Sequence, residues 1–345
     1  MATILMNLLS LVPRLAGHHI TVVGDVILDE YIVGTATRMS REAPIPVLEF
    51  EQRQLIPGGA ANPAANVAAL GSAARLVGIV GADNDATTLR QVLQARGIAT
   101  DGLVVDGGRP TTVKTRILAQ MGLRFPQQVA RIDRLSRADI NGSCEQRIAE
   151  ALSNADKTEA YLLSDYQNGL ITPPVIDAVR DAAAVGTRHA SSAHTAPLLA
   201  ADAQGQFDKY GGFGVVKCNA NEARTYLRRD LHTHDEFAAA ARDLCERLRL
   251  TIGMVITRGA DGATICHADG STAHCPAPAI TDVYDTVGAG DTAIAILTLA
   301  IVAGATLTEA ATLANYASGV VVRRVGNYTP SAAELVDAIE QYRTN

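Results

Sequence analysis

Several features that would assign a protein to a class at once are missing from this 345-residue sequence. It contains no run of lysine or arginine, only four lysines, and a formal net charge of -6. Without a basic patch, no nucleic-acid partner is expected. Hydrophobic residues make up 48% of the chain, which excludes intrinsic disorder. The length suits one large folded unit or two modest ones.

Cysteine is scarce and shows no pairing pattern. The five cysteines are odd in number and widely spread, with no C-x-x-C pair and no histidine at metal-ligand spacing. This distribution predicts reduced cysteines buried as small apolar residues, as is typical of a cytoplasmic protein.

No apolar run is long enough for a membrane-spanning helix. The most apolar segment, Ala293–Leu307, is bracketed by Asp291 and Glu309 and is shorter than the ~20 residues that a span needs. We therefore predict a buried helix and no membrane association. Residues 1–17 are also apolar, but Arg14 follows the apolar run instead of preceding it, which favours an amphipathic first helix over a secretory signal.

Short apolar runs alternate with longer alanine-rich stretches of helical period, which predicts an α/β protein with a mostly parallel sheet. The predicted strands are Ile20–Val23, Ala74–Val80, Ala160–Leu163, Val215–Lys217 and Met254–Thr257. The predicted helices are Ala64–Leu70, Ala86–Arg96, Cys144–Ser153, Pro174–Ala183, Asp235–Arg247, Thr292–Ala303 and Thr308–Arg323.

Two segments break this alternation. Tyr31–Gln54 and Thr111–Asp133 have strand-like period-two features with no helix inside them. We expect them to form a small separate sheet, made by about residues 30–55 and 111–133. No linker or internal repeat divides the chain, so residues 1–345 are interpreted as a single domain.

The most informative motif is a glycine turn directly before the apolar helix. Gly288 and Gly290 permit a tight turn, and the free amides of a helix start attract an anion. A carboxylate at that turn, Asp291, is well placed to accept a proton. The alternative is a glycine-rich loop in which Asp291 is an ordinary N-cap.

Two further polar motifs lie early in the chain. Asp25 and Asp29 follow the first predicted strand and suit hydrogen bonding to neighbouring sugar hydroxyls, although they are also compatible with a turn aspartate and an exposed aspartate. The run from Gly58 and Gly59 to Asn62 precedes a helix, so its backbone amides and the Asn62 side chain are candidates for further hydroxyl contacts.

Four motifs occur in the order seen in the PfkB carbohydrate kinases, which have the ribokinase-like fold. They are Gly58-Gly59 with Asn62 and Asn66, Asn219-Ala220-Asn221-Glu222, Thr257-Arg258-Gly259, and Gly288-Ala289-Gly290-Asp291. The resemblance covers about residues 20–343. Within that family, residues 24–31, 38–47, 58–71, 127–133 and 163–166 are similar to segments of the heptose 7-phosphate kinases.

The resemblance implies a three-layer α/β/α core with a small β-sheet lid and ATP-dependent phosphoryl transfer to a sugar hydroxyl. Asp291 would be the base, and the amides of Gly288, Ala289 and Gly290 would stabilise the phosphoryl charge. Asn219 and Glu222 would hold Mg²⁺ through water, and Asp285 would lie near a K⁺ ion. A homodimer is also implied.

The resemblance also implies two larger sets of binding residues. The implied nucleotide-binding residues are Asn219, Glu222, Thr257, Arg258, Gly259, Gly262 and Asn315. The implied sugar or sugar-phosphate contacts are Asp25, Asp29, Gly58, Gly59, Asn62, Lys114, Arg116, Arg131, Asp133 and Asp165. Because lysine is scarce, arginine is expected to recognise much of the phosphate charge. For Arg116 and Arg131, a solvated charge on a strand face is the alternative.

The chain departs from the family pattern at two positions. Relatives usually carry lysine where this sequence has Asn168 and Gln204, and a neutral amide cannot offset phosphate charge as an ammonium does. Lys217, shortly before Asn219, is a candidate replacement. Two alternatives therefore stay open: a kinase for another sugar or a nucleoside, and a sugar-binding protein with weak catalysis.

Overall fold

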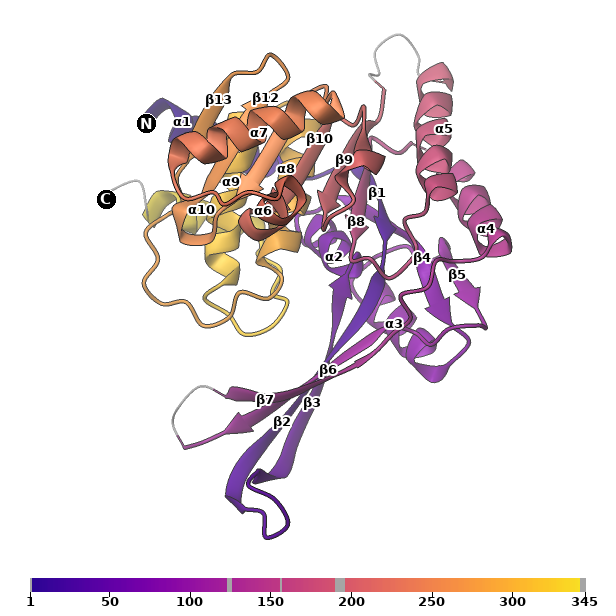
Figure 1. The fold of residues 1–345 in the computed structure, drawn as a ribbon, viewed down its shortest axis with the longest axis vertical. Coiled ribbons are helices and arrows are strands. Elements are labelled where there is room, and N and C mark those ends of the chain that lie inside the picture. The colour runs from indigo at the N-terminus through magenta and orange to yellow at the C-terminus, as the bar shows by residue number, and fades with distance from the viewer. Residues whose placement is uncertain (1, 123–125, 156, 190–195, 342–345) are drawn as a thin grey trace.

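A nine-stranded sheet forms the centre of the protein (Figure 1). The computed structural model describes residues 2–122, 126–155, 157–189 and 196–341. The strand order is β13-β12-β11-β10-β9-β8-β1-β4-β5, parallel from β11 to β5 and antiparallel in β12 and β13. The strands are β1 (His19–Gly24), β4 (Ala73–Gly81), β5 (Leu103–Asp106), β8 (Ala160–Asp165), β9 (Leu198–Ala203), β10 (Val215–Asn219), β11 (Gly253–Thr257), β12 (Ala263–His267) and β13 (Thr272–Cys275).

Helices cover both faces of this sheet, because successive strand residues point to opposite sides. Val22 belongs to the apolar cluster on one face and Val23 to the cluster on the other. The first face carries α1 (Ala2–Leu11), α2 (Ala61–Ala69), α3 (Asn84–Gln94), α8 (Ala289–Val302), α9 (Leu307–Val321) and α10 (Ala332–Gln341). The second carries α4 (Gly142–Ser153), α5 (Pro173–His189), α6 (Ala220–Leu227) and α7 (His234–Leu248).

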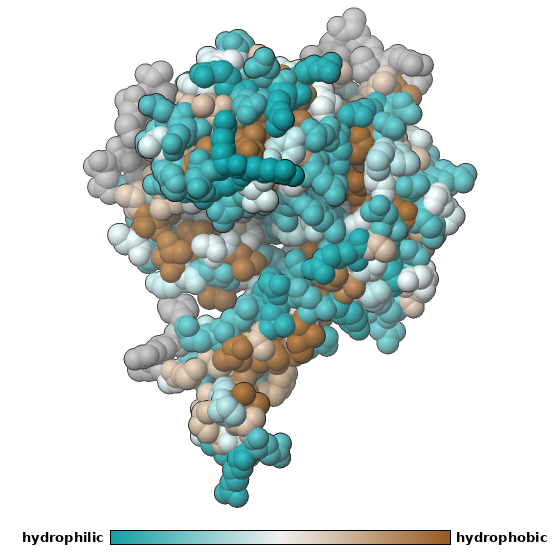
Figure 2. All heavy atoms as spheres, in the orientation of Figure 1, coloured by the Kyte–Doolittle hydropathy of each residue, from teal (hydrophilic) through white to brown (hydrophobic). Residues whose placement is uncertain are grey.

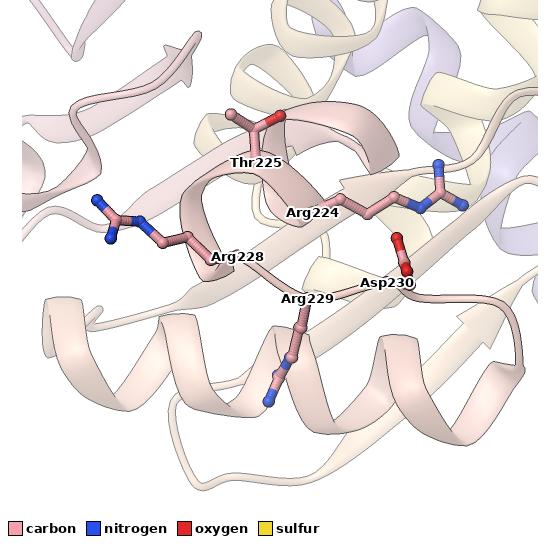
Figure 3. A pocket seen from close by; sticks show the side chains of 5 residues that line it. All are labelled: Arg224, Thr225, Arg228, Arg229 and Asp230. Carbon is pink, nitrogen blue, oxygen red and sulfur yellow. The ribbon is translucent and has the colours of Figure 1, made fainter.

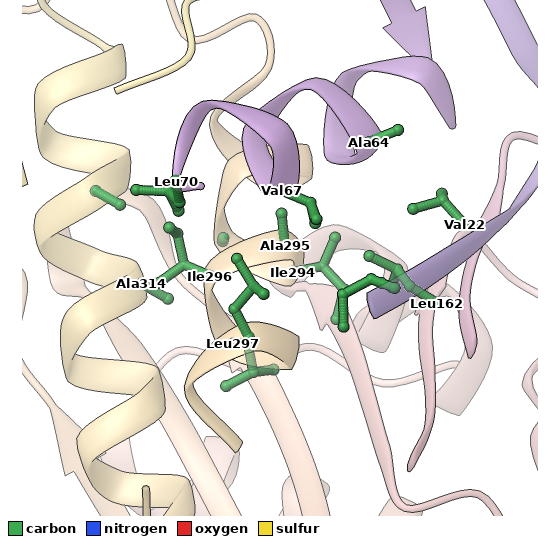
Figure 4. Packing of buried hydrophobic residues seen from close by; sticks show 14 of the residues in the cluster. Val22, Ala64, Val67, Leu70, Leu162, Ile294, Ala295, Ile296, Leu297 and Ala314 are labelled. Atoms are coloured by element: carbon green, nitrogen blue, oxygen red, sulfur yellow. The ribbon is translucent and has the colours of Figure 1, made fainter. Parts of the chain in front are cut away.

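Helix α8 is buried on every side along most of its length. Its residues from Asp291 to Ala300 are all buried, and Ile294 and Leu297 pack among strand and helix side chains such as Leu162 and Val67 (Figure 4). A helix enclosed in this way has one fixed position, so its N-terminal turn is fixed as well. Of the helices described, none has the length and apolar character to cross a membrane.

A second, four-stranded sheet projects away from the body (Figures 1 and 2). This projecting sheet has the order β3-β2-β6-β7 and consists of β2 (Val26–Met39), β3 (Pro46–Gly59), β6 (Val113–Gln120) and β7 (Gln127–Arg134). Only Asp25 separates β1 from β2, and β3 ends directly before α2. The base of the projecting sheet therefore lies beside the central sheet.

The predicted α/β class and every predicted strand and helix are confirmed, with ends that differ by a few residues. The segments near residues 30–55 and 111–133 do form a separate small sheet. The pattern missed β5, β9, β12, β13, α6 and α10.

Candidate active site

The predicted functional residues gather where the parallel strands end. Asp25 follows β1, Asp165 ends β8, and Asn219 and Thr257 end β10 and β11, where they are paired in register. Within the sheet, β1 has β4 as its neighbour on one side and β8 on the other. The chain goes from β1 to β4 first and adds β8 later, so the direction of strand order reverses at β1. In this architecture, ligands usually bind at the carboxyl ends of parallel strands where the strand order reverses in this way.

Asp291 lies in the first turn of α8 and is 5% exposed. Its Oδ2 accepts a hydrogen bond from Asn62 Nδ2 at 3.0 Å, and its Oδ1 accepts one from the Tyr166 hydroxyl at 2.7 Å. Burial, followed by the charge of Asp202, raises the pKa of Asp291 to about 7, against the opposing effect of these hydrogen bonds. The carboxylate can therefore accept and release a proton near neutral pH.

The glycine turn has the predicted shape, with one correction. Gly288 is the N-cap of α8 with φ +81°, and a Cβ there would lie 2.9 Å from both Asn62 Nδ2 and Asn327 Oδ1, so only glycine fits. The N-cap alternative for Asp291 is wrong. The amide of Ala289 donates to Thr286 O at 3.3 Å, which leaves the amides of Gly290 and Asp291 as the candidate anion donors of the turn.

Asp25 and Asp165 hold the chain at the carboxyl ends of β1 and β8. Asp25 accepts from the amides of Tyr166, Asn168 and Leu170 at 2.8, 3.0 and 3.3 Å, and burial raises its pKa to about 6. Asp165 is bound by the Tyr210 hydroxyl at 2.7 Å and by Lys209 Nζ at 2.5 Å. These bonds, with one from the Gln167 amide to Asp165, use three of the four lone pairs of each carboxylate, and the predicted contacts of Asp25 and Asp165 with a sugar stay predictions.

Asp29 forms a buried charged cluster at the base of the projecting sheet. It forms an ion pair with Arg116, which lies over the Tyr31 ring, and accepts from Asn327 Nδ2 at 2.5 Å. A Cβ on Gly58 would lie 2.1 Å from Asp29 Oδ2, so glycine lets β3 approach the carboxylate. Gly59 makes a similar close approach to Asp25 O. Arg116 is buried, so its interpretation as a solvated charge is wrong.

The other cations of the projecting sheet are more open. Lys114 Nζ lies 5.0 Å above the Tyr166 ring, and burial lowers its pKa. Arg131 and Asp133 form an exposed ion pair at 2.9 Å on β7, where Asp133 is paired in register with Lys114. Lys114 and the Tyr166 ring thus connect the projecting sheet to Asp291.

Asn219 and Glu222 form a capping box at the start of α6. Asn219 Oδ1 accepts from the amides of Asn221 and Glu222 at 2.9 Å, and Glu222 Oε2 accepts from the Asn219 amide at 2.6 Å. The capping box fixes the Asn219 and Glu222 side chains at the carboxyl end of β10. Thr257 is placed beside them by its Oγ1, which donates to Cys218 O at 3.2 Å. Across the described parts of the chain, no cluster of histidine, cysteine, aspartate or glutamate forms a ready metal cage.

Three other predicted residues have structural contacts. The Arg258 guanidinium lies 4.3 Å from the Phe237 ring centre and contacts His234 at 3.0 Å, and the place of residue 258 along a triphosphate stays a prediction. Asn315 donates to Cys275 O at 2.8 Å, and Asp285 accepts from the amides of Val287 and Gly326.

Gly259 and Gly262 turn the chain between β11 and β12. Both have positive φ angles, +60° and +81°, and a Cβ on Gly259 would meet open space whereas one on Gly262 would collide with Cys275 O at 2.2 Å. The turn can therefore be approached from the side of Gly259, next to Thr257. The monovalent cation at Asp285 stays a prediction.

Sequence reasoning assigned no site role to Tyr166 or Asp202. Tyr166 binds Asp291 directly, and Asp202 on β9 pairs with Lys217 on β10 at 2.7 Å. The sequence feature that could have marked both residues is a polar side chain at the end of a buried strand. That feature becomes informative only when the order of the strands is known.

A surface cavity of about 310 Å³ lies at the far end of α6 (Figure 3). It is lined by Arg224, Thr225, Arg228, Arg229 and Asp230. The Arg224 guanidinium donates to Leu231 O and Asn221 Oδ1, and Arg228 points away from the other labelled side chains (Figure 3). This cavity contains none of the predicted site residues, so the carboxyl ends of the parallel strands remain the candidate active site.

Known proteins share both the fold and the sequence pattern. The chain is 34% identical over 331 residues to the bifunctional protein HldE of Pelobacter propionicus and 37% identical over 328 residues to that of Caulobacter vibrioides. These matches cover 96% and 93% of this chain but only 65% and 63% of those proteins.

Solved structures support the fold. Phosphofructokinase-2 of Escherichia coli, in complex with substrates and products, has a TM-score of 0.74 at 16% identity and covers 95% of this chain and 100% of its own. Ribokinase of Arabidopsis thaliana, with ribose and ATP, has a TM-score of 0.68 at 18% identity and covers 94% and 99%. The family model for pfkB family carbohydrate kinases matches residues 18–334, and the chain therefore belongs to that family.

Proposed function

We propose that this protein transfers the γ-phosphoryl group of ATP to a hydroxyl of a phosphorylated sugar, with Asp291 as the base. The observation that carries the proposal is a single buried carboxylate with a pKa of about 7 in the first turn of α8. A base and an anion site on the same turn suit phosphoryl transfer to an alcohol.

The chemistry follows from these positions. The sugar hydroxyl gives its proton to an Asp291 oxygen, its oxygen forms a bond to the γ-phosphorus, and the bond from that phosphorus to the bridging oxygen breaks to release ADP. Asn62 and Tyr166 each use one lone pair on a different Asp291 oxygen, so each oxygen keeps a second lone pair for the substrate. The amides of Gly290 and Asp291 meet the charge on the phosphoryl group.

Asn219, Glu222 and Thr257 are proposed to face the nucleotide. The Glu222 carboxylate is a hard oxygen donor that suits the water shell of Mg²⁺. That ion, when bound, neutralises phosphate charge. Asn219 Oδ1 already accepts from two backbone amides, so the group that Asn219 offers to a phosphate oxygen is its Nδ2. Asn219 and Thr257 are paired in register at the ends of β10 and β11, and Glu222 lies beside them in the first turn of α6, which supports this assignment. A K⁺ ion near Asp285 is a separate proposal, tested by the dependence of the rate on KCl.

The acceptor is proposed to be a heptose 7-phosphate or a related sugar phosphate. Lys114 and Arg131, on neighbouring strands of the projecting sheet, suit the phosphate of such an acceptor. Asp29 Oδ1 is bound by Arg116 and Oδ2 by Asn327, so each oxygen keeps one lone pair with which we propose that Asp29 accepts from a sugar hydroxyl, beside Asn62 and the Gly58-Gly59 end of β3. Because Lys114 lies over Tyr166, which binds Asp291, a bound sugar phosphate would bridge the sheet and the base.

The test is a phosphoryl-transfer assay with ATP and Mg²⁺ against a panel of sugars, sugar phosphates and nucleosides. Transfer to a heptose 7-phosphate with the highest kcat/KM supports the proposal. A higher value for another sugar or a nucleoside overturns the acceptor assignment. Binding of a sugar phosphate with no transfer to any acceptor would favour a sugar-binding protein, the alternative to which the neutral Asn168 and Gln204 point.

We also propose that the projecting sheet is a lid over the sugar and an interface between two copies of the chain. It exposes large apolar side chains, among them Phe50 at 68% and Met39 and Ile132 at 59% each. Brown surface on the projecting sheet is visible in Figure 2. Sedimentation measures the assembly: a dimer that Phe50→Glu converts to a monomer supports the proposal, and a monomeric wild type contradicts it.

A further inference from the structure

Lys217 is a lysine buried beneath the start of α8. It lies on β10, where alternation places it on the same face as Val215, the face that α8 covers. Its side chain is 5% exposed. A buried ammonium needs partners for its charge and for its three N–H groups.

Two partners hold the ammonium group. Asp202, directly opposite on β9, accepts through Oδ1 at 2.9 Å and Oδ2 at 2.7 Å. The third contact is much longer, with Gly290 O at 3.4 Å. The ammonium group of Lys217 is thus bound firmly by Asp202 and only weakly by the glycine turn.

The glycine turn is shaped around this ammonium. A Cβ on Gly290 would lie 3.1 Å from Lys217 Nζ, so the lysine head lies directly against the residue that precedes Asp291. Burial lowers the pKa of Lys217, but the charges of Asp202, Glu222 and Asp291 raise it by more, and the group stays an ammonium.

Carboxylates outnumber cations at this point. Asp202, Glu222 and Asp291 all act on the one ammonium group. A terminal phosphate that arrives at the amides of Gly290 and Asp291 adds further negative charge. The site then needs a cation at the turn, and the fixed position of Lys217 supplies one without reorganisation.

We propose that Lys217 binds the terminal phosphate of the nucleotide, exchanging its weak contact with Gly290 O for a phosphate oxygen while Asp202 keeps it in place. This inference rests on the proposed function. It makes Asp202 a positioning residue, because its carboxylate acts through the lysine, and it assigns the cation of the phosphate site to β10.

A second buried pair provides a matched control. Lys209 Nζ contacts Asp165 at 2.5 Å and Ile171 O at 3.2 Å, with the Tyr210 ring 5.6 Å away. Phe207 and Tyr210, which flank Lys209 in sequence, belong to the apolar cluster on the opposite face of the sheet. Lys209→Met therefore also removes a buried lysine from an aspartate, but away from the glycine turn.

The experiment measures binding of ATP and of ADP, each with Mg²⁺ and without sugar, by calorimetry on the full chain. We expect Lys217→Met to weaken ATP binding by at least ~10-fold. ADP binding should weaken by less than about 2-fold, because ADP lacks the γ-phosphate that Lys217 would bind. Lys209→Met is expected to leave the ratio of the two affinities unchanged.

Two further variants separate phosphate binding from folding. Lys217→Met combined with Asp202→Asn removes both charges, so no lone carboxylate stays buried; it should show the same selective loss of ATP affinity. Asp202→Asn alone keeps the cation but weakens the contacts that fix it, so it should weaken ATP binding by less than Lys217→Met does. An unchanged ratio of ATP to ADP affinity in the folded double variant overturns the inference and leaves the proposed function intact. A wild-type protein that binds no ATP overturns both.

Discussion

The glycine turn of α8 and the outer strand β7 of the projecting sheet differ in how their charged residues are held. At the turn, Asp291 and Lys217 are buried, and each is held by partners from other elements. On the projecting sheet, β7 is exposed along its whole length, and Arg131 pairs with a neighbour on the same strand. Buried charges have one geometry, whereas exposed ones are easily rearranged. The comparison suggests that the turn sets the reaction and the sheet sets the acceptor.

The largest expected effect is at the turn. Asp291→Asn should lower kcat by at least ~10²-fold, in the range of a removed general base, with little change in the KM for the sugar. Steady-state kinetics of both substrates measure this. Asp177→Asn, which changes an exposed carboxylate paired with Arg180 on α5, is the control. A change in KM alone would mean that Asp291 binds substrate and does not take its proton.

The projecting sheet should show the opposite split. Lys114→Ala with Arg131→Ala is expected to raise the KM for the sugar phosphate by roughly 10-fold or more, because charged hydrogen bonds to the acceptor are lost, and to leave kcat within about 2-fold. Arg38→Ala, an exposed arginine near the end of β2, is the control. An equal loss for a sugar without phosphate would contradict phosphate recognition by this sheet.

The contact between the two regions is tested at Tyr166. Its hydrogen bond lowers the pKa of Asp291, so Tyr166→Phe should raise that pKa above about 7 and shift the acid limb of the kcat/KM profile to higher pH. Activity at pH 7 should fall on the order of 3- to 10-fold and recover at pH 9. Tyr226→Phe, which removes a hydroxyl bound to Asp208, serves as the control. An unshifted limb would show that another group controls the profile.

The smallest effect concerns stability. The folded pKa of Asp291, about 7, lies above the ordinary value of 3.8, so the buried carboxylate destabilises the fold increasingly as pH rises from about 4 to 7. Asp291→Asn removes this burden and should raise Tm by roughly 2–4 °C at pH 8. The gain should be smaller at pH 5, where the carboxyl is mostly protonated. Thermal unfolding at both pH values measures it, and a larger gain at pH 5 would contradict the raised pKa.

Local patterns determined the layers of the fold and the position of the glycine turn before α8. The apolar run after Asp291 and the glycines before it already specify a buried helix that starts at a glycine turn, because those properties depend on neighbouring residues. The strand pattern also separated the projecting sheet from the core.

Only the tertiary structure decided the partners of each polar group. Asp25 turned out to bind the loop after β8, and Arg258 packs on α7. Tyr166, Asn62 and Asp291 meet although they are far apart along the chain. The physical reason is that hydrogen bonds and ion pairs act over a few ångströms, and the strand order decides which residues come that close. For the same reason, Lys217 faces Asp202 and Gly290, a placement that its own neighbours in the sequence do not reveal.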